Sequence, residues 1–384
     1  MVFFISWLLS LWRKWFRRGI TDEQNSSSNL FISFKTIQTA TNGFSDQNLL
    51  GQGGFGPVYK GVLADGGQIA VKKLSLSSRQ GVLEFTNEVS ILLKVQHRNL
   101  VSLLGCCVEG DDKMLIYELL PNRSLDLILF DKKKSFTLHW SKRLEIITGI
   151  VKGLLYLHEE SPVKIIHRDI KASNILLDGN MNPKISDFGM ARLFEDDDTH
   201  VNTFRISGTY GYMAPEYATK GYMSAKTDVF SFGIMVLEIL SGRKNLDRLL
   251  DDDLYDLLGY TWKVYQQGKM FDIMDTSLAD WDAGEAALCI QIGLLCCQEI
   301  IADRPDMLTV HIMLSSESFT LPKLGRPGTR GRSYPRQSEI NDASDGNNCT
   351  TSSSSQTTRQ PTSGTVSSGE DCTRASITIS LTGR

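Results

Sequence analysis

The sequence predicts an α+β fold of two lobes, with an antiparallel sheet and one main helix in the first lobe and mostly helices in the second. Short strands separated by glycine-containing turns are expected at residues 58–62 and 68–72. Apolar residues recur at helical spacing over residues 85–92, and again over the longer stretches 140–158 and 228–240. Strands that are followed by a run of helices favour this fold class.

Composition limits the kinds of protein that this chain can be. Its 384 residues are 41% hydrophobic and 22% charged, which is enough to bury a large core. The formal net charge of −3 gives no reason to expect a nucleic-acid partner. The seven cysteines include two adjacent pairs, Cys106-Cys107 and Cys296-Cys297, which stand among apolar residues. We expect reduced core cysteines there, because no CxxC spacing supports a metal or redox site.

Shifts in composition divide the chain into four parts. Residues 1–19 are apolar and then basic, whereas residues 20–43 begin as a serine-rich linker and end with apolar residues that we expect to pack on the next domain. Residues 322–384 contain few large apolar side chains, so we expect a disordered tail. The folded domain between them is expected over residues 44–321, with lobes at 44–117 and 122–321 and a connection at 118–121.

The first residues have three possible interpretations. An apolar run at residues 2–12 is followed by basic residues up to Arg18. Eleven residues are too few to span a bilayer, which takes roughly 20. The segment could be a helix in the membrane interface, the remnant or short form of a spanning segment, or an incidental disordered start. Val at position 2 excludes N-myristoylation.

A glycine-rich stretch opens the first lobe. It has the pattern Gly51-x-Gly53-x-x-Gly56, which is a weak signal alone. A strand follows it, and not the helix that a dinucleotide-binding fold requires, so an oxidoreductase is disfavoured. We therefore expect a flap folded over phosphates. Its residues are Leu50, Gly51, Gly53, Gly54, Phe55, Gly56 and Val58.

Lys72 ends an Ile-Ala-Val-Lys strand, where a lysine can hold the α- and β-phosphates of a nucleotide. A buried lysine needs a counter-charge, and the helix predicted over residues 85–92 offers Glu88, with Glu84 one turn earlier as the competing partner. We favour Glu88. The next apolar strand ends near Pro121, and there the backbone of Glu118 and Leu120 is expected to face adenine, with Tyr117 behind it.

Chemistry centres on residues 167–174, His-Arg-Asp-Ile-Lys-Ala-Ser-Asn. Phosphoryl transfer needs a carboxylate to orient a hydroxyl, a cation to neutralise charge and an oxygen ligand for magnesium. Asp169, Lys171 and Asn174 are these types in that order. Asp187, in the triplet Asp-Phe-Gly, is the second expected metal ligand.

The segment from Asp187 to Glu216 carries hydroxyl side chains and an acidic run. Arg168, beside Asp169, is a cation that a phosphate can satisfy, so we expect activation by phosphorylation. Thr203 is the preferred site, and the other candidates are Thr199, Ser207 and Thr209. Two scaffold roles are also expected: Asp228 holds the backbone at Arg168, and Arg304 pairs with Glu216.

These motifs in this order resemble protein kinases, over about residues 44–321. The stretches 51–61, 96–107, 182–192 and 208–217 resemble plant receptor-like kinases of the cysteine-rich and S-domain-related groups. The resemblance implies a bilobal protein kinase fold, ATP and Mg²⁺ as cofactors, and serine/threonine specificity from Lys171. It also implies that Ala70 and Leu176 line the nucleotide site.

The resemblance further implies signalling at the cytoplasmic face of the plasma membrane, with the cytosol as the alternative. Expected partners are protein substrates and a membrane receptor or co-receptor, because the chain shows neither an ectodomain nor a full spanning segment. An alternative function is a catalytically weak scaffold that binds ATP and partner receptors. All the expected catalytic and metal-binding residues are present, which favours the enzyme.

Overall fold

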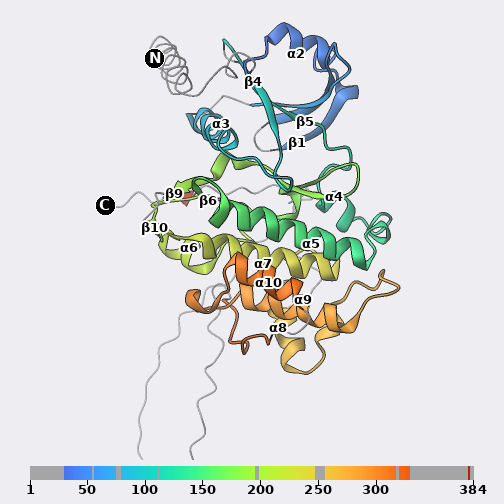
Figure 1. Cartoon of the computed structure of the whole chain (residues 1–384), viewed down its shortest axis with the longest axis vertical. Helices are drawn as coiled ribbons and strands as arrows, with labels where there is room; N and C mark the ends of the chain where they lie inside the picture. The colour runs from blue at the N-terminus through green and yellow to red at the C-terminus, as the bar shows by residue number, and fades with distance from the viewer. Residues whose placement is uncertain are drawn as a thin grey trace, which may run out of the picture. The chain divides into compact units, whose positions relative to one another are not determined.

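The structure is a computed structural model of the chain, and it describes residues 30–53, 56–74, 79–110, 112–194, 199–246, 256–316, 320–328 and 379–380. The predicted first lobe is present as a five-stranded antiparallel sheet in the order β1-β2-β3-β5-β4 (Figure 1). Its strands are β1 (Leu49–Gly53), β2 (Gly56–Val62), β3 (Gln68–Lys73), β4 (Leu103–Glu109) and β5 (Asp112–Glu118).

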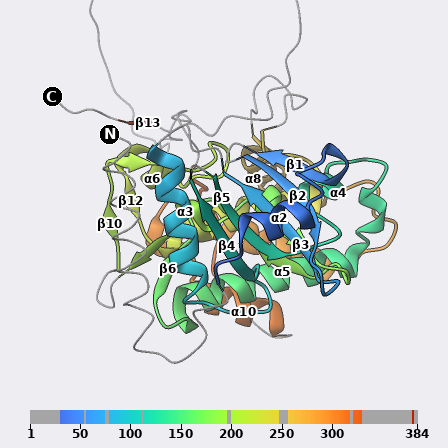
Figure 2. The same ribbon diagram turned by 90° about the horizontal axis from the view of Figure 1, so that it is seen from above.

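Two helices cover the sheet, and Figure 2 shows both against it. The main helix, α3 (Arg79–Leu92), packs Phe85 and Val89 into the same core as Leu115 of β5. The shorter α2 (Phe34–Ala40) buries Ile37 completely in a second cluster that includes Met114. Neighbouring strand residues thus join different clusters, because successive side chains of a strand point to opposite faces.

The predicted packing of the apolar residues before the domain is therefore confirmed, since α2 covers one face of the sheet. Backbone hydrogen bonds also join Ile32 N to Cys106 O at 3.0 Å and Cys106 N to Leu30 O at 2.8 Å. The five described cysteines are buried in the hydrophobic clusters, as the sequence predicts: Cys106, Cys107, Cys289, Cys296 and Cys297.

The second lobe is mostly helical, with α5 and α7 packed against each other in its core (Figure 1). Its helices are α4 (Asp126–Leu129), α5 (Trp140–Leu155), α6 (Pro215–Lys220), α7 (Ala225–Ser241), α8 (Leu257–Gln266), α9 (Ala283–Cys296) and α10 (Met307–Ser315). Its short antiparallel pairs are β6 (Lys164–Ile166) with β9 (Arg192–Phe194), β7 (Ile175–Leu177) with β8 (Pro183–Ile185), β10 (Val201–Asn202) with β12 (Tyr222–Met223), and β11 (Arg205–Ile206) with β13 (Ile379–Ser380).

Helix α7 is buried on nearly every side, as its uniformly apolar sequence predicts. Ser224 and Thr227 form a reciprocal cap at its start, and Gly242 ends it with φ of 64°. This burial makes α7 a fixed support for the loops that pack on it.

The start of the expected tail differs from the prediction. Gly325 N donates to Gln298 Oε1 at 2.8 Å, and Gly328 N donates to Cys297 O at 2.8 Å. Residues 325–328 are therefore held at the end of α9, where backbone groups compensate for the few large side chains. Disorder of most of the remaining tail stays a prediction, because residues 329–378 and 381–384 lie outside the described part, as do residues 1–29.

Candidate active site

The candidate catalytic loop, residues 167–174, follows β6 and is held by α7. Asp228 accepts hydrogen bonds from the backbone N–H of His167 at 2.7 Å and of Arg168 at 2.8 Å. Its other partner is His158 Nε2 at 3.1 Å. Burial would raise the pKa of Asp228, but the hydrogen bond and charge of His158 lower it below its ordinary value. The expected support by Asp228 is present, and it bends the chain so that Arg168 adopts φ of 71°.

Asp169 is held by three side chains. Lys171 Nζ lies 2.8 Å from its Oδ2, and Asn174 Nδ2 donates to the same oxygen at 3.0 Å. Thr209 Oγ1 donates to Oδ1 at 2.7 Å and also accepts from Lys171 Nζ at 2.8 Å. The Asp169 carboxylate therefore has a defined orientation, as a group that must position a hydroxyl requires.

Lys72 and two carboxylates form the second part of the site. Lys72 Nζ lies 3.0 Å from Glu88 Oε2 and 2.9 Å from Asp187 Oδ1. Burial alone would lower the pKa of Lys72, but the two carboxylates outweigh burial and raise it. The pKa of Asp187 is lowered because the charge of Lys72 outweighs the effect of burial. Both shifts favour the charged forms of Lys72 and Asp187, and the expected pair of Lys72 with Glu88 is formed.

The turn after β8 directs Asp187 at Lys72. Asp187 adopts φ of 71°, a left-handed conformation that is uncommon for a residue with a side chain. Phe188 is fully buried, and its ring meets the ring of His167 edge-on with centroids 4.9 Å apart. Packing of Phe188 therefore maintains the conformation that brings Asp187 to the lysine.

Two contacts in this region were not predicted from the sequence. Tyr117 Oη donates to Glu88 Oε1 at 2.6 Å, which leaves the other oxygen of Glu88 for Lys72. Asn87 Nδ2 lies 3.2, 3.0 and 2.7 Å from the carbonyl oxygens of Phe188, Gly189 and Ala191. In the sequence, Asn87 is visible only as a polar amide on an amphipathic helix, which does not by itself predict these hydrogen bonds. The first contact joins α3 to β5, and the second joins α3 to the turn that follows Asp187.

The residues expected around a nucleotide come from both lobes. In the glycine flap, Gly51 pairs with Val58 and Gly53 with Gly56 across β1 and β2, while Gly54 and Phe55 lie outside the described residues. Ala70 pairs with Tyr117 across β3 and β5. Leu50 is in β1 and Leu176 is in β7. Glu118 and Leu120 form the connection, where Glu118 N donates to Ser102 O at 3.2 Å and the Glu118 side chain pairs with Lys184 at 3.0 Å.

The donor set suits a hard divalent cation. Asn174 uses its Nδ2 on Asp169 O at 2.8 Å and on Asp169 Oδ2, which turns its amide oxygen away from Asp169. Asp187 supplies a carboxylate that is ionised. Amide and carboxylate oxygens are ligands that Mg²⁺ accepts together with phosphate oxygens. Asn174 and Asp187 therefore fit a metal that is bound with a nucleotide.

The segment from Asp187 to Glu216, the candidate activation segment, holds the four candidate phosphorylation sites in different surroundings. The hydroxyl of Thr209 is hydrogen-bonded to Asp169 and Lys171, and Ser207 is only 6% exposed. Thr199 is exposed and Thr203 is partly exposed; the hydroxyl of Thr203 lies 3.2 Å from the backbone N–H of Arg205. The geometry thus favours Thr203 and Thr199 as acceptors and gives Thr209 a positioning contact with Asp169.

Arg168 has only neutral partners in the described part of the chain. Its guanidinium donates to Tyr217 Oη at 2.6 Å and to the carbonyl oxygens of Met190 at 3.0 Å and Arg205 at 3.2 Å. Elsewhere in the lower lobe, Arg304 Nη1 lies 2.7 Å from Glu216 Oε1, the ion pair that the sequence predicts.

Comparisons with known proteins agree with this geometry. The family model "Protein tyrosine and serine/threonine kinase" matches residues 44–280. The chain is 51% identical over 308 residues to "Cysteine-rich receptor-like protein kinase 10" of Arabidopsis thaliana, an alignment that covers 80% of this chain and 46% of that protein. It is 53% identical over 320 residues to "Receptor-like serine/threonine-protein kinase SD1-7" of the same plant, covering 81% of this chain and 38% of that protein.

This chain thus spans less than half the length of both relatives. The matched residues include the glycine flap, the catalytic loop and the Asp187 turn, and the lobes show the expected bilobal arrangement. The chain belongs to the protein tyrosine and serine/threonine kinase family.

Proposed function

We propose that this chain is an active serine/threonine protein kinase that transfers the γ-phosphate of ATP to hydroxyl groups of proteins and uses Mg²⁺. The observation that carries the proposal is the pair of neighbouring clusters in which Lys72 contacts Glu88 and Asp187 while Asp169 contacts Lys171 and Asn174. A formed Lys72–Glu88 pair and a metal-binding carboxylate are both required for transfer in this family.

Each residue has a separate task in the proposed reaction. Asp169 orients the attacking hydroxyl and accepts its proton, and Lys171 neutralises charge that develops on the transferred group. Lys72 holds the α- and β-phosphates, and its pair with Glu88 fixes its position. Asn174 and Asp187 hold the metal. A bound Mg²⁺ neutralises charge on the phosphates.

Serine/threonine specificity is supported by Lys171 and Thr209. The lysine links Asp169 to the hydroxyl of Thr209 on the segment that precedes α6. This link leaves the Asp169 carboxylate close to the activation segment, where a short side chain such as serine can reach it. The alternative, a scaffold that binds nucleotide without turnover, gains no support because none of these groups is missing.

Incubation of the purified chain with labelled ATP and MgCl₂ is the direct test. We expect label on serine and threonine of the chain and of a generic basic protein substrate, and no label on tyrosine. Chelation of the metal should abolish the reaction, since the phosphates then lose their counter-charge. A folded chain that never labels itself or any protein would overturn the proposed function.

We further propose that phosphorylation of Thr203 activates the kinase. Arg168 donates to the carbonyl oxygen of Arg205, whose backbone N–H contacts Thr203, and Arg192 pairs with Ile166, two residues before Arg168. Within the described residues, none of the three arginines has a carboxylate within ion-pair distance. A phosphate would bring about two negative charges to this cationic group.

The kinase activity of the Thr203→Ala variant is expected to be roughly tenfold lower than that of the autophosphorylated wild type. A loss of this size corresponds to one charge-assisted hydrogen bond. Phosphatase treatment should lower the activity of the wild type to that of the variant and leave the variant unchanged. Thr199→Ala removes the other favoured acceptor on the same segment and should retain full activity, which distinguishes the two sites. Full activity in Thr203→Ala would contradict the activating role.

Location at the cytoplasmic face of the plasma membrane, beside a receptor or co-receptor, is a further proposal, and similarity to receptor-like kinases supports it. The apolar and basic residues 1–18 lie outside the described part of the chain. Every helix in the described part is too short or too polar to cross a bilayer. Cell fractionation with and without residues 1–18 tests the proposal, and equal solubility of both forms would count against it.

A further inference from the structure

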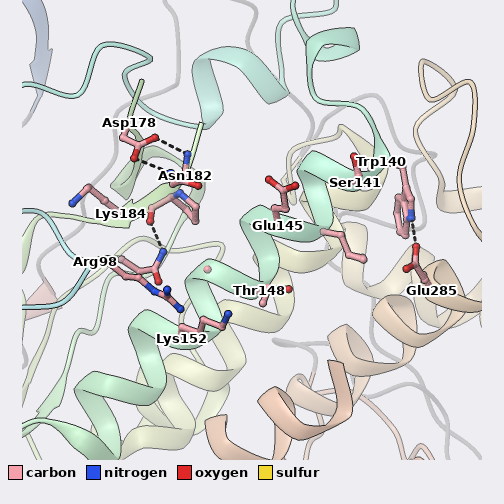
Figure 3. A pocket seen from close by; sticks show the side chains of 14 residues that line it. Arg98, Trp140, Ser141, Glu145, Thr148, Lys152, Asp178, Asn182, Lys184 and Glu285 are labelled. Carbon is pink, nitrogen blue, oxygen red and sulfur yellow. Dashed lines mark hydrogen bonds between the residues drawn. The ribbon is translucent and has the colours of Figure 1, made fainter. Parts of the chain in front are cut away.

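A pocket of about 750 Å³ lies outside the proposed active site, between α5 and the β7–β8 hairpin. One wall is a single face of α5, on which Trp140, Leu144, Thr148 and Lys152 follow each other at intervals of four residues. Figure 3 labels Trp140, Thr148 and Lys152 along this wall. The hairpin provides the other wall, with Asn182 and Lys184. No residue proposed to bind ATP or metal lines this pocket.

Close packing between α5 and the β7–β8 hairpin fixes the walls of the pocket. A Cβ added at Gly149 would lie 2.5 Å from Pro183 Cγ, so only glycine lets α5 approach the hairpin at this point. Asn99 Nδ2 donates to Pro183 O at 2.9 Å, and Lys184 pairs with Glu118 at 3.0 Å. The hairpin wall is therefore fixed to the loop before β4 and to the connection between the lobes.

The two ends of the pocket differ in character. Trp140 and Leu144 provide an apolar end, where Trp140 Nε1 donates to Glu285 Oε2 at 2.6 Å. Lys152 lies 12 residues further along α5, which is roughly 18 Å at 1.5 Å per residue. Arg98 belongs to this second end, because its neighbour Asn99 would be within 3.3 Å of a Cβ built on Gly153. The pocket is thus an elongated groove that is apolar at one end and basic at the other.

The groove is lined by three cations and three carboxylates, so its basic character belongs to one end and not to the whole groove. Its three carboxylates already have protein partners: Glu145 pairs with Lys142, Asp178 accepts from Asn182, and Glu285 accepts from Trp140. Arg98 and Lys152, by contrast, have no ion pair within the described residues.

The basic end also acts on a neighbouring residue. The pKa of His97 is lowered, first by burial and then by the charges of Arg98, Lys184 and Lys152, against an opposing effect of Glu160. Three cations from three different segments therefore lie close enough together to influence the same imidazole. Such a cluster attracts an anionic ligand.

We propose that this groove is a docking site for an extended acidic peptide segment of a partner protein. An acidic side chain of the segment contacts Arg98 and Lys152, and a large apolar side chain packs against Trp140 and Leu144. An extended chain rises about 3.3 Å per residue, so roughly 18 Å separates residues five or six positions apart. Charge complementarity selects the acidic end, and the distance between the two ends selects the spacing.

The test measures binding of synthetic peptides to the full chain without nucleotide, by fluorescence anisotropy. Each labelled peptide contains one Leu and one Glu-Glu pair separated by two to eight residues of Gly and Gln, in either order, and no hydroxyl residue that the active site could phosphorylate. We expect the strongest binding at a separation of four to six residues. Replacement of the Glu pair by Lys should abolish it.

The double variant Arg98→Glu/Lys152→Glu should bind the best peptide at least tenfold more weakly than the wild type. In Leu144→Ser, removal of the Leu from the peptide should change the affinity less than it does for the wild type. Lys263→Glu with Lys269→Glu, which changes net charge equally at exposed positions outside the groove, should leave binding unchanged. Arg98→Gln with Lys152→Gln gives a milder form of the test, and thermal melting confirms that the variants are folded.

Three results would overturn the proposal: no saturable binding by any peptide, affinities that do not depend on spacing, or equal loss of binding in both charge-reversal variants. Phosphorylation of a generic substrate by Arg98→Glu/Lys152→Glu should remain at the wild-type rate. Failure of docking therefore leaves the proposed kinase activity intact, and failure of activity leaves the docking measurement valid.

Discussion

Asp169→Asn is expected to slow phosphoryl transfer by about 10²–10⁴-fold, the usual contribution of a positioned general base. Asparagine has one acceptor oxygen, so it keeps either the contact of Oδ1 with Thr209 or the contact of Oδ2 with Lys171, and its amide cannot take the proton of the attacking hydroxyl. Single-turnover transfer from labelled ATP measures this loss.

Nucleotide affinity should stay near the wild-type value in this variant, because Lys72 and Asp187 are unchanged. Asp280→Asn, at an exposed position, is the matched control for loss of one carboxylate and should retain full activity. Transfer by Asp169→Asn within a factor of three of the wild type would show that another group acts as the base.

Lys72→Met is expected to reduce transfer by about 10²–10³-fold, as removal of one preorganised electrostatic contact does. Methionine fills a similar volume but leaves the carboxylates of Glu88 and Asp187 without their cation. Nucleotide binding should weaken in parallel, which titration of a fluorescent ATP analogue measures. Lys94→Met, an exposed lysine near the end of α3, is the control and should bind normally.

The same substitution has a consequence for pH. Lys72 is the main cause that holds the pKa of Asp187 below its ordinary value against burial. Without the lysine, burial dominates and the pKa rises. Asp187 must be ionised to hold the metal, so metal-dependent nucleotide binding should be lost at a higher pH in Lys72→Met than in the wild type as the pH falls. Identical pH profiles would exclude this coupling.

Much of the site follows from spacing along the chain. The motif around Asp169 and the strand that ends at Lys72 identify the chemical groups, and helical periodicity around Glu88 identifies the side chain that can reach the lysine. These are local patterns, and local patterns are read most reliably when the period is strong. The buried α7 was predictable for the same reason.

Other contacts join segments that are distant in sequence, and no pattern announces them. Thr209 lies 40 positions from Asp169, yet its hydroxyl donates a hydrogen bond to that carboxylate. For this reason Thr209 is no longer a favoured phosphorylation site. Tyr117 was expected behind adenine, and the structure adds its hydrogen bond to Glu88. Residues 325–328 were expected in a disordered tail because their composition is polar, but they bond to the backbone at the end of α9.

The amino-acid order by itself determined the fold class, the identity of the groups that act on a phosphate and the family to which the chain belongs. Only the tertiary structure decided which partners those groups have, that Lys72 is already paired with two carboxylates, and that α5 and the β7–β8 hairpin enclose a groove with two cations that have no ion pair in the part of the chain the structure describes. The physical reason is that periodicity and side-chain chemistry are local properties, whereas pairing and burial depend on how separate segments approach one another in space.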